Sequence, residues 1–255
     1  GGDERTNADL IAEINSGAGI LNYRGHGGWS DISGPPYGEF WGTNWNTSLE
    51  DFTRANAASV NTGGKLPIVF SISCTNAWLD AANDTLSEEF FKGTDGAVAF
   101  LGASRPSYTT PNHDFDKSLF TAIGTNQTYN IGWTLNSANA AILDAYGSNS
   151  SAGDNVRMFL WLGDPAMEIR TSGIAYLYVS HPANVPNGIM TVNVTNVLGY
   201  GIQNALVNID GPGVYTHKYT DSSGTATFYF IPSGSGTMDV TVSKHNYRPY
   251  QGSTE

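Results

Sequence analysis

The sequence predicts an α/β domain, a parallel sheet with helices on both faces, followed by a smaller all-β sandwich. Up to about residue 171, short apolar runs typical of buried strands alternate with segments of helical periodicity. Such alternation indicates a parallel sheet flanked by helices. Beyond that point the helical signal disappears and short alternating strands are separated by turn sequences. We therefore predict two domains, residues 1–171 and 172–255, a division that suits a chain of 255 residues.

In the first domain, helical segments lead into apolar strands. The expected helices cover residues 9–16, 49–60, 85–92, roughly 115–123 and 134–146. The expected strands cover residues 20–23, 66–73 and 96–102. Because these strands are apolar along almost their whole length, both faces of their sheet are expected to be covered.

The second domain is expected to hold five short strands. They cover residues 175–179, 190–194, 205–209, 225–230 and 238–242. Turn sequences such as Asp210-Gly211-Pro212-Gly213 separate them, and this spacing predicts a small β-sandwich. A sandwich by itself assigns no function, so we expect a structural or spacer role.

Charge and cysteine content exclude several classes of function. Twelve Lys and Arg against 23 Asp and Glu give a net charge of −11, which argues against nucleic acid or an anionic membrane as a partner, because Lys and Arg bind phosphate groups. No apolar run approaches the roughly 18 residues of a membrane helix, so no membrane insertion is expected. A composition low in Lys and rich in Asn, Ser, Thr and Gly favours a secreted or cell-surface protein. The single Cys74 excludes an internal disulfide and leaves a buried thiol, a metal ligand or a nucleophile.

Two reactive side chains follow the first two expected strands directly. The first strand runs into Gly25-His26-Gly27 and the second into Ser73-Cys74. Functional groups of parallel sheets gather at the carboxyl ends of the strands, so neighbouring strands would bring His26 and Cys74 together as a dyad. An imidazole nearby favours the reactive thiolate, and the N–H groups of Gly27 and Cys74 could hold an oxyanion. Taken singly, such residues are more often structural, since free Cys is among the most buried residue types.

Longer motifs surround both residues. An apolar block ending in His-Gly covers residues 19–27, and an apolar block ending in a small residue and Cys covers residues 68–74. Further motifs are Trp41-Gly42-Thr43, Cys74-Thr75-Asn76-Ala77, Gly96-Ala97-Val98-Ala99 and Leu162-Gly163-Asp164-Pro165. In these motifs the sequence resembles the clan of cysteine peptidases that includes caspases, legumain and the gingipains, and the gingipain family in particular.

The resemblance implies a caspase-like fold followed by an immunoglobulin-like domain, and endopeptidase activity on protein or peptide substrates. His26 would act as acid and base, and Cys74 as the nucleophile that forms a thioester. The amides of Gly27 and Cys74 would form the oxyanion hole. This chemistry requires no cofactor, and a zinc site on His26 and Cys74 is disfavoured because two ligands fall short of the usual three or four.

The resemblance also implies residues of the substrate pocket. Gingipains place an aromatic residue in a Ser-Trp-x-x-Pro setting, matched here by residues 107–111, so Tyr108 beside Ser107 would line the pocket unless it is an ordinary loop aromatic. Asp114 or Asp116 would pair with a basic P1 side chain, or would be a solvated or helix N-terminal carboxylate. Residues of the loop after His26 would rim the cleft or pack in the core: Trp29, Asp31, Trp41 and Trp45.

Gingipains carry a sheet subdomain, and an acidic residue that orients the catalytic His, upstream of the matched stretch. We therefore expect that an upstream half of the same precursor is missing here, with Glu13 and Asp31 as the available stand-ins for that acid. Gingipains also bind calcium, and a structural calcium ion would take oxygen ligands from acidic loop residues, with no diagnostic spacing. The candidates are Asp80, Asp84, Glu88 and Asp95.

Two other functions are compatible with these residues. The missing upstream half and the unassigned pocket acid would suit a catalytically inactive caspase-like module for binding or assembly. Alternatively, the dyad would serve transpeptidation, as in a sortase-like surface enzyme.

Overall fold

The computed structural model describes residues 6–28, 40–42, 51–81, 83–185, 188–231 and 236–255. The chain divides into two compact units, Gly1–Ile169 and Arg170–Glu255. The predicted division after residue 171 lies close to this one.

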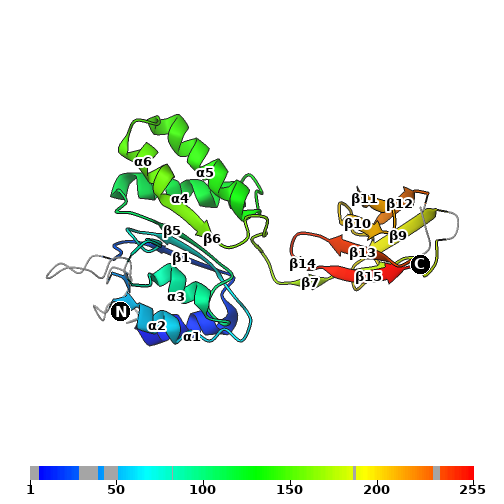
Figure 1. Ribbon diagram of the computed structural model, residues 1–255, viewed down its shortest axis with the longest axis horizontal. Coiled ribbons are helices and arrows are strands. Elements are labelled where there is room, and N and C mark those ends of the chain that lie inside the picture. Colours follow the sequence, from blue (N-terminus) through cyan, green and yellow to red (C-terminus); the bar gives the residue numbers. More distant parts are fainter. Residues whose placement is uncertain (1–5, 29–39, 43–50, 82, 186–187, 232–235) are drawn as a thin grey trace. The chain divides into compact units, whose positions relative to one another are not determined.

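A four-stranded sheet with the order β1-β4-β5-β6 forms the centre of the first unit (Figure 1). Its strands are β1 (Ile20–Arg24), β4 (Ile68–Ile72), β5 (Ala99–Ala103) and β6 (Phe159–Leu162). The first three run parallel, and β6 pairs antiparallel with β5. The prediction of a parallel sheet flanked by helices is confirmed, with an antiparallel strand that the sequence analysis missed.

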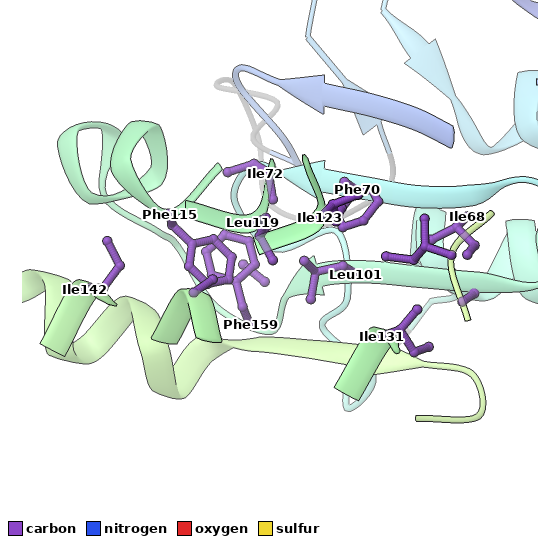
Figure 2. Packing of buried hydrophobic residues seen from close by; sticks show 14 of the residues in the cluster. Ile68, Phe70, Ile72, Leu101, Phe115, Leu119, Ile123, Ile131, Ile142 and Phe159 are labelled. Atoms are coloured by element: carbon purple, nitrogen blue, oxygen red, sulfur yellow. The ribbon is translucent and has the colours of Figure 1, made fainter. Parts of the chain in front are cut away.

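The two central strands of the sheet, β4 and β5, are covered on both faces. All five residues of β4 and all five of β5 are buried. Side chains alternate along each strand, so Phe70 joins one core and its neighbour Val69 joins the other. Figure 2 shows the first of these cores, where Phe115 and Leu119 pack with sheet residues.

Helices lie on the two sides of this sheet (Figure 1). One set comprises α1 (Asn7–Gly17), α2 (Arg54–Ala58) and α3 (Leu86–Lys92), and the other comprises α4 (Thr109–Gly124), α5 (Ile131–Tyr146) and α6 (Ser151–Met158). Polar side chains begin several of them: Thr6 accepts a hydrogen bond from the Asp9 N–H, and Asn130 accepts one from the Trp133 N–H.

The expected helix over residues 49–60 is wrong at its start. Residues 43–50 lie outside the described part, Phe52–Thr53 form strand β3, and only Arg54–Ala58 are helical. Strand β3 pairs with β2 (Phe40–Trp41), and the Phe52 ring stacks on Trp41 with ring centroids 5.1 Å apart. This contact between distant residues outweighs the local helical preference.

The second unit consists of two antiparallel sheets around one core. One sheet has the order β11-β10-β13-β15 and the other β12-β9-β8. Their strands are β8 (Tyr178–Ser180), β9 (Ile189–Thr195), β10 (Leu206–Gly211), β11 (Val214–Tyr219), β12 (Thr225–Tyr229), β13 (Met238–Ser243) and β15 (Tyr250–Thr254). Short strands β7 (Ala175–Tyr176) and β14 (Tyr247–Arg248) pair with each other.

Alternate residues of both sheets point into that core, as in a β-sandwich. Val192 on β9 and Val240 on β13 are fully buried. Strands β11, β14 and β15 were not predicted. In the described part of the chain, no helix has the length and apolar character needed to cross a membrane.

Candidate active site

The pairing of β1 with β4 places His26 and Cys74 at equivalent positions of one sheet edge. Arg24 pairs with Ile72 in a parallel register, an offset of 72 − 24 = 48 residues. His26 and Cys74 each lie two residues beyond this last pair, and their own offset, 74 − 26, is also 48. The prediction that the two residues follow neighbouring parallel strands is therefore confirmed.

The loops that carry these two residues are in direct contact through Gly27. A Cβ atom added at Gly27 would lie 2.5 Å from the backbone oxygen of Cys74, 2.8 Å from Oδ1 of Asn76 and 2.9 Å from Oγ of Ser73. Only a glycine allows the backbone to approach so closely. In the described part of the chain, the N–H groups of Gly27 and Cys74 make no hydrogen bond.

Tyr23 and Gly42 hold the backbone of His26 through two hydrogen bonds. The Tyr23 hydroxyl donates to the backbone oxygen of His26 at 2.7 Å, and the Gly42 N–H donates to the same oxygen at 2.8 Å. Burial raises the pKa of Tyr23 far above its ordinary value, so the phenol keeps its proton and remains a donor. The His26 side chain itself is exposed.

Three atoms of Ser107 lie near the thiol of Cys74. Its N–H donates to Sγ at 3.4 Å, its backbone oxygen lies 3.4 Å from Sγ, and its hydroxyl lies 3.7 Å from Sγ. The neighbouring Tyr108 is the N-cap of α4 and its side chain is 45 % exposed. The structure therefore brings Ser107 to Cys74 and leaves the ring of the next residue accessible.

Trp41 is part of the core and does not rim the cleft. It is 1 % exposed, and its indole N–H donates to Oγ of Ser71 at 2.8 Å. The hydroxyls of Ser71 and Ser73 in turn donate to Oδ1 of Asn76. Sequence reasoning missed this buried network, although the Trp-Gly-Thr and Cys-Thr-Asn motifs contain two of its members.

The residue after Cys74 has a strained backbone. Thr75 adopts a φ of 60° and its side chain is buried, with no hydrogen-bond partner for its hydroxyl. β-Branched residues rarely adopt this backbone conformation, so the surrounding structure must hold Thr75 in it. Such strain is common beside functional groups.

The two candidate pocket acids lie on α4 and face other elements. Asp114 accepts a hydrogen bond from the hydroxyl of Tyr146 on α5, and this bond raises the pKa of Tyr146. Asp116 accepts a hydrogen bond from Asn22 at 3.2 Å and lies 4.0 Å from Arg24 Nε. Burial raises the pKa of Asp116. The structure thus gives Asp114 a partner on α5, and its role as a pocket acid stays a prediction.

Four further candidates lie either outside the described residues or on α1. Trp29, Asp31 and Trp45 lie outside the described residues. Glu13 belongs to α1, which ends at Gly17, before β1 begins at Ile20. The acid that would orient His26 is therefore still unassigned.

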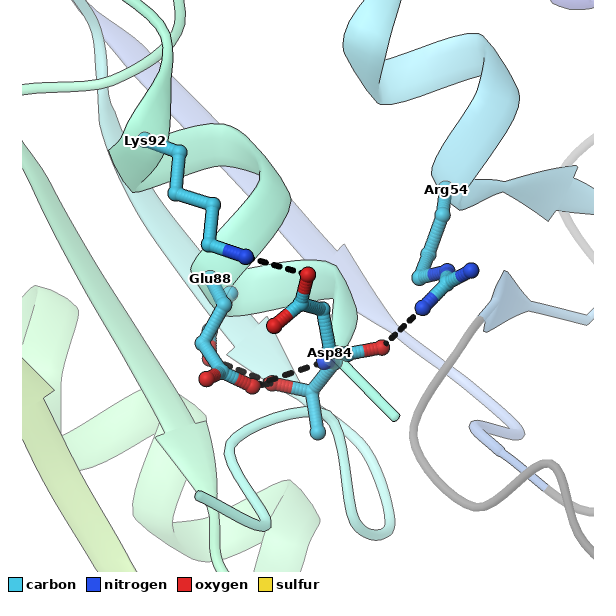
Figure 3. A network of polar contacts seen from close by, with 6 residues as sticks. Arg54, Asp84, Glu88 and Lys92 are labelled. Carbon is cyan, nitrogen blue, oxygen red and sulfur yellow. Dashed lines mark hydrogen bonds and ion pairs between the residues drawn. The ribbon is translucent and has the colours of Figure 1, made fainter. Parts of the chain in front are cut away.

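The acidic residues considered for calcium have partners within the protein. Asp80 pairs with the guanidinium of Arg105 through two bonds of 2.8 Å, and this lowers the pKa of Asp80. Asp84 pairs with Lys92, and Glu88 accepts from the N–H of Thr85 (Figure 3). Among the described residues, no group of three His, Cys, Asp or Glu side chains is placed to hold a metal ion. Calcium binding stays a prediction.

The fold and this edge define a class of protein: an α/β protein with a cysteine and a histidine after adjacent parallel strands. The sequence model of peptidase family C25 matches residues 1–170. The chain therefore belongs to peptidase family C25, and the predicted gingipain-like family is confirmed.

Two solved structures have the same fold. One is the crystal structure of the Arg-specific cysteine proteinase gingipain R (RgpB), with a TM-score of 0.79, 17 % sequence identity and 98 % of this chain covered. The other is a complex of the Porphyromonas gingivalis RgpB pro- and mature domains, with a TM-score of 0.79, 16 % identity and 98 % of this chain covered. The matches cover only 56 % and 57 % of those chains. Comparison with curated proteins finds no match.

Proposed function

We propose that this chain is the dyad-bearing part of a secreted or cell-surface cysteine endopeptidase, with His26 and Cys74 as its catalytic residues. The observation that carries the proposal is the register of β1 and β4, which places the two residues at equivalent positions of one sheet edge. Membership of peptidase family C25 supports it.

In the proposed reaction, the Cys74 sulfur attacks the carbonyl carbon of the peptide bond and the thiol proton passes to His26. The C–N bond then breaks, His26 gives the proton to the leaving amine, and a thioester remains on Cys74. Water, deprotonated by His26, attacks the thioester, releases the acid and restores the thiol. The N–H groups of Gly27 and Cys74 would stabilise the negative oxygen in both steps, which fits their lack of other acceptors in the described part of the chain.

The substrate side of the proposal rests on the segment that follows β5. Ser107 touches the Cys74 sulfur, and the exposed ring of Tyr108 comes next in the chain. We propose that Tyr108 lines the pocket for the substrate side chain that precedes the cleaved bond. A part corresponding to the stretches of the solved relatives that this chain does not match would supply further pocket residues and the acid that orients His26. The second unit would serve as an immunoglobulin-like spacer.

The test compares the chain with Cys74→Ala and His26→Ala on a panel of peptides that differ at P1. Each variant is expected to lose hydrolysis by at least about a thousandfold, because it removes the nucleophile or its base. His113→Ala, which removes an exposed histidine on α4, is the matched control and should keep full activity. A thiol-directed inhibitor should add its mass once, because Cys74 is the chain's single cysteine.

The proposal would be refuted by hydrolysis that persists unchanged in Cys74→Ala. Absence of hydrolysis with every peptide, in a chain whose Cys74 is inert to the inhibitor, would favour an inactive binding module.

A further inference from the structure

Trp41 contacts strand β1 and the loop that carries His26, and it contacts strand β4, which leads to Cys74. On the His26 side, Trp41 forms a β-bridge with Gly27, and its ring stacks on Tyr23 with centroids 4.9 Å apart. On the Cys74 side, its indole N–H donates to Ser71 Oγ, 30 residues further along the chain, at 2.8 Å. The indole therefore links β1 to β4, the two strands that lead to His26 and Cys74.

The link continues from Ser71 to the turn that holds Cys74. The Ser71 hydroxyl donates to Asn76 Oδ1 at 2.9 Å, and Ser73 donates to the same atom. Trp41, Ser71 and Asn76 are each at most 1 % exposed. Water is thus excluded from this relay, and each lost partner would leave a buried polar group without its hydrogen bond.

The position of Asn76 gives these contacts a consequence for the dyad. Cys74 and Asn76 flank the strained Thr75, whose φ of 60° must be held by neighbouring contacts. Asn76 Oδ1 also lies against Gly27, at 2.8 Å from the site of a Cβ. A shift of Asn76 would therefore move Cys74 relative to the loop that carries His26.

We propose that Trp41, Ser71 and Asn76 are positioning residues that together hold Cys74 at its working distance from His26. The proposal rests on the proposed function, since it assigns these residues a role in the reaction of that dyad. None of the three touches the substrate or the reacting atoms; each acts through Cys74 or through the loop of His26.

The first test is Trp41→Phe, which keeps an aromatic ring in the core and removes the indole N–H. The control is Trp161→Phe, because the Nε1 of Trp161 is buried without a hydrogen-bond partner. We expect kcat of Trp41→Phe to fall about 10- to 100-fold with KM within about threefold, as for a small misplacement of reacting groups. The pH at which Cys74 becomes reactive towards iodoacetamide should rise in Trp41→Phe and stay unchanged in Trp161→Phe.

The second test is Ser71→Ala, alone and combined with Trp41→Phe. Residues of one hydrogen-bond network are coupled, so the double variant should retain about as much activity as the less active of the two single variants. Losses that multiply, or a Trp41→Phe that matches Trp161→Phe in both kcat and alkylation, would overturn the inference. Loss of hydrolysis in Cys74→Ala decides the proposed function separately, and alkylation needs no substrate, so failure of either idea can be recognised by itself.

Discussion

Replacing Gly27 with Ala tests the contact between the two loops most directly. The added Cβ would lie 2.5 Å from the Cys74 oxygen, whereas carbon and oxygen atoms approach to about 3.3–3.6 Å. The loops must therefore separate by roughly 0.8–1.1 Å. A misplacement of this size costs about a hundredfold in rate, equivalent to about 2.7 kcal/mol in the barrier. Overpacking of this buried contact should also lower the free energy of unfolding by about 1–3 kcal/mol.

The assay compares kcat/KM on the best peptide substrate, and unfolding in urea, between Gly27→Ala and Gly19→Ala. Gly19 precedes the same strand and has no positive φ. In the described part of the chain, a Cβ added at Gly19 would meet no atom within 4 Å apart from its chain neighbours, so its substitution should change neither quantity. If Gly27→Ala keeps kcat/KM within about threefold of Gly19→Ala, the loops are not held at the contact distance that we describe.

Three further substitutions test the packing and charge of the two units. Phe70→Ala should lower the free energy of unfolding by about 3–5 kcal/mol in urea titration, because Phe70 is fully buried between the sheet and α4. Phe91→Ala, at a 43 % exposed site, should lower it by less than about 1 kcal/mol. Equal losses would contradict the assigned core. Burial raises the folded pKa of Asp116 above 3.8, so ionisation is penalised only in the folded state; Asp116→Asn should match wild type in stability near pH 3 and exceed it increasingly as the pH rises through the folded pKa, and a constant difference would count against this. Thr220→Val removes a buried hydroxyl that bonds two backbone groups of the second unit. It should lower the free energy of unfolding of that unit by about 1–3 kcal/mol, measured by calorimetry; unchanged stability would contradict the assigned hydrogen bonds.

The central strands could be predicted because their signal is local. A strand buried on both faces is a continuous apolar run, and Ile68–Ile72 is such a run with Cys74 two residues beyond its end. Strand β6 was missed because its four residues follow directly on helix α6, and only its pairing with β5 makes this short apolar segment a strand.

The role of Trp41 could not be predicted, because the same indole would suit a cleft rim or a core. Its burial depends on Phe52, 11 residues away, and on Ser71, 30 residues away. Asp114 shows the same limit: its sequence position suits a pocket acid, but its partner is Tyr146 on another helix.

The sequence by itself determined that a histidine and a cysteine follow two apolar strands, because strand patterns and the residues after them are local properties; the pairing of these strands as parallel neighbours was decided by the tertiary structure. Only the tertiary structure decided which buried hydrogen bonds support those residues. The network of Trp41, Ser71 and Asn76 forms because two segments distant in the chain, one with Trp41 and one with Ser71 and Asn76, come together in the fold, where buried polar groups must find hydrogen-bond partners.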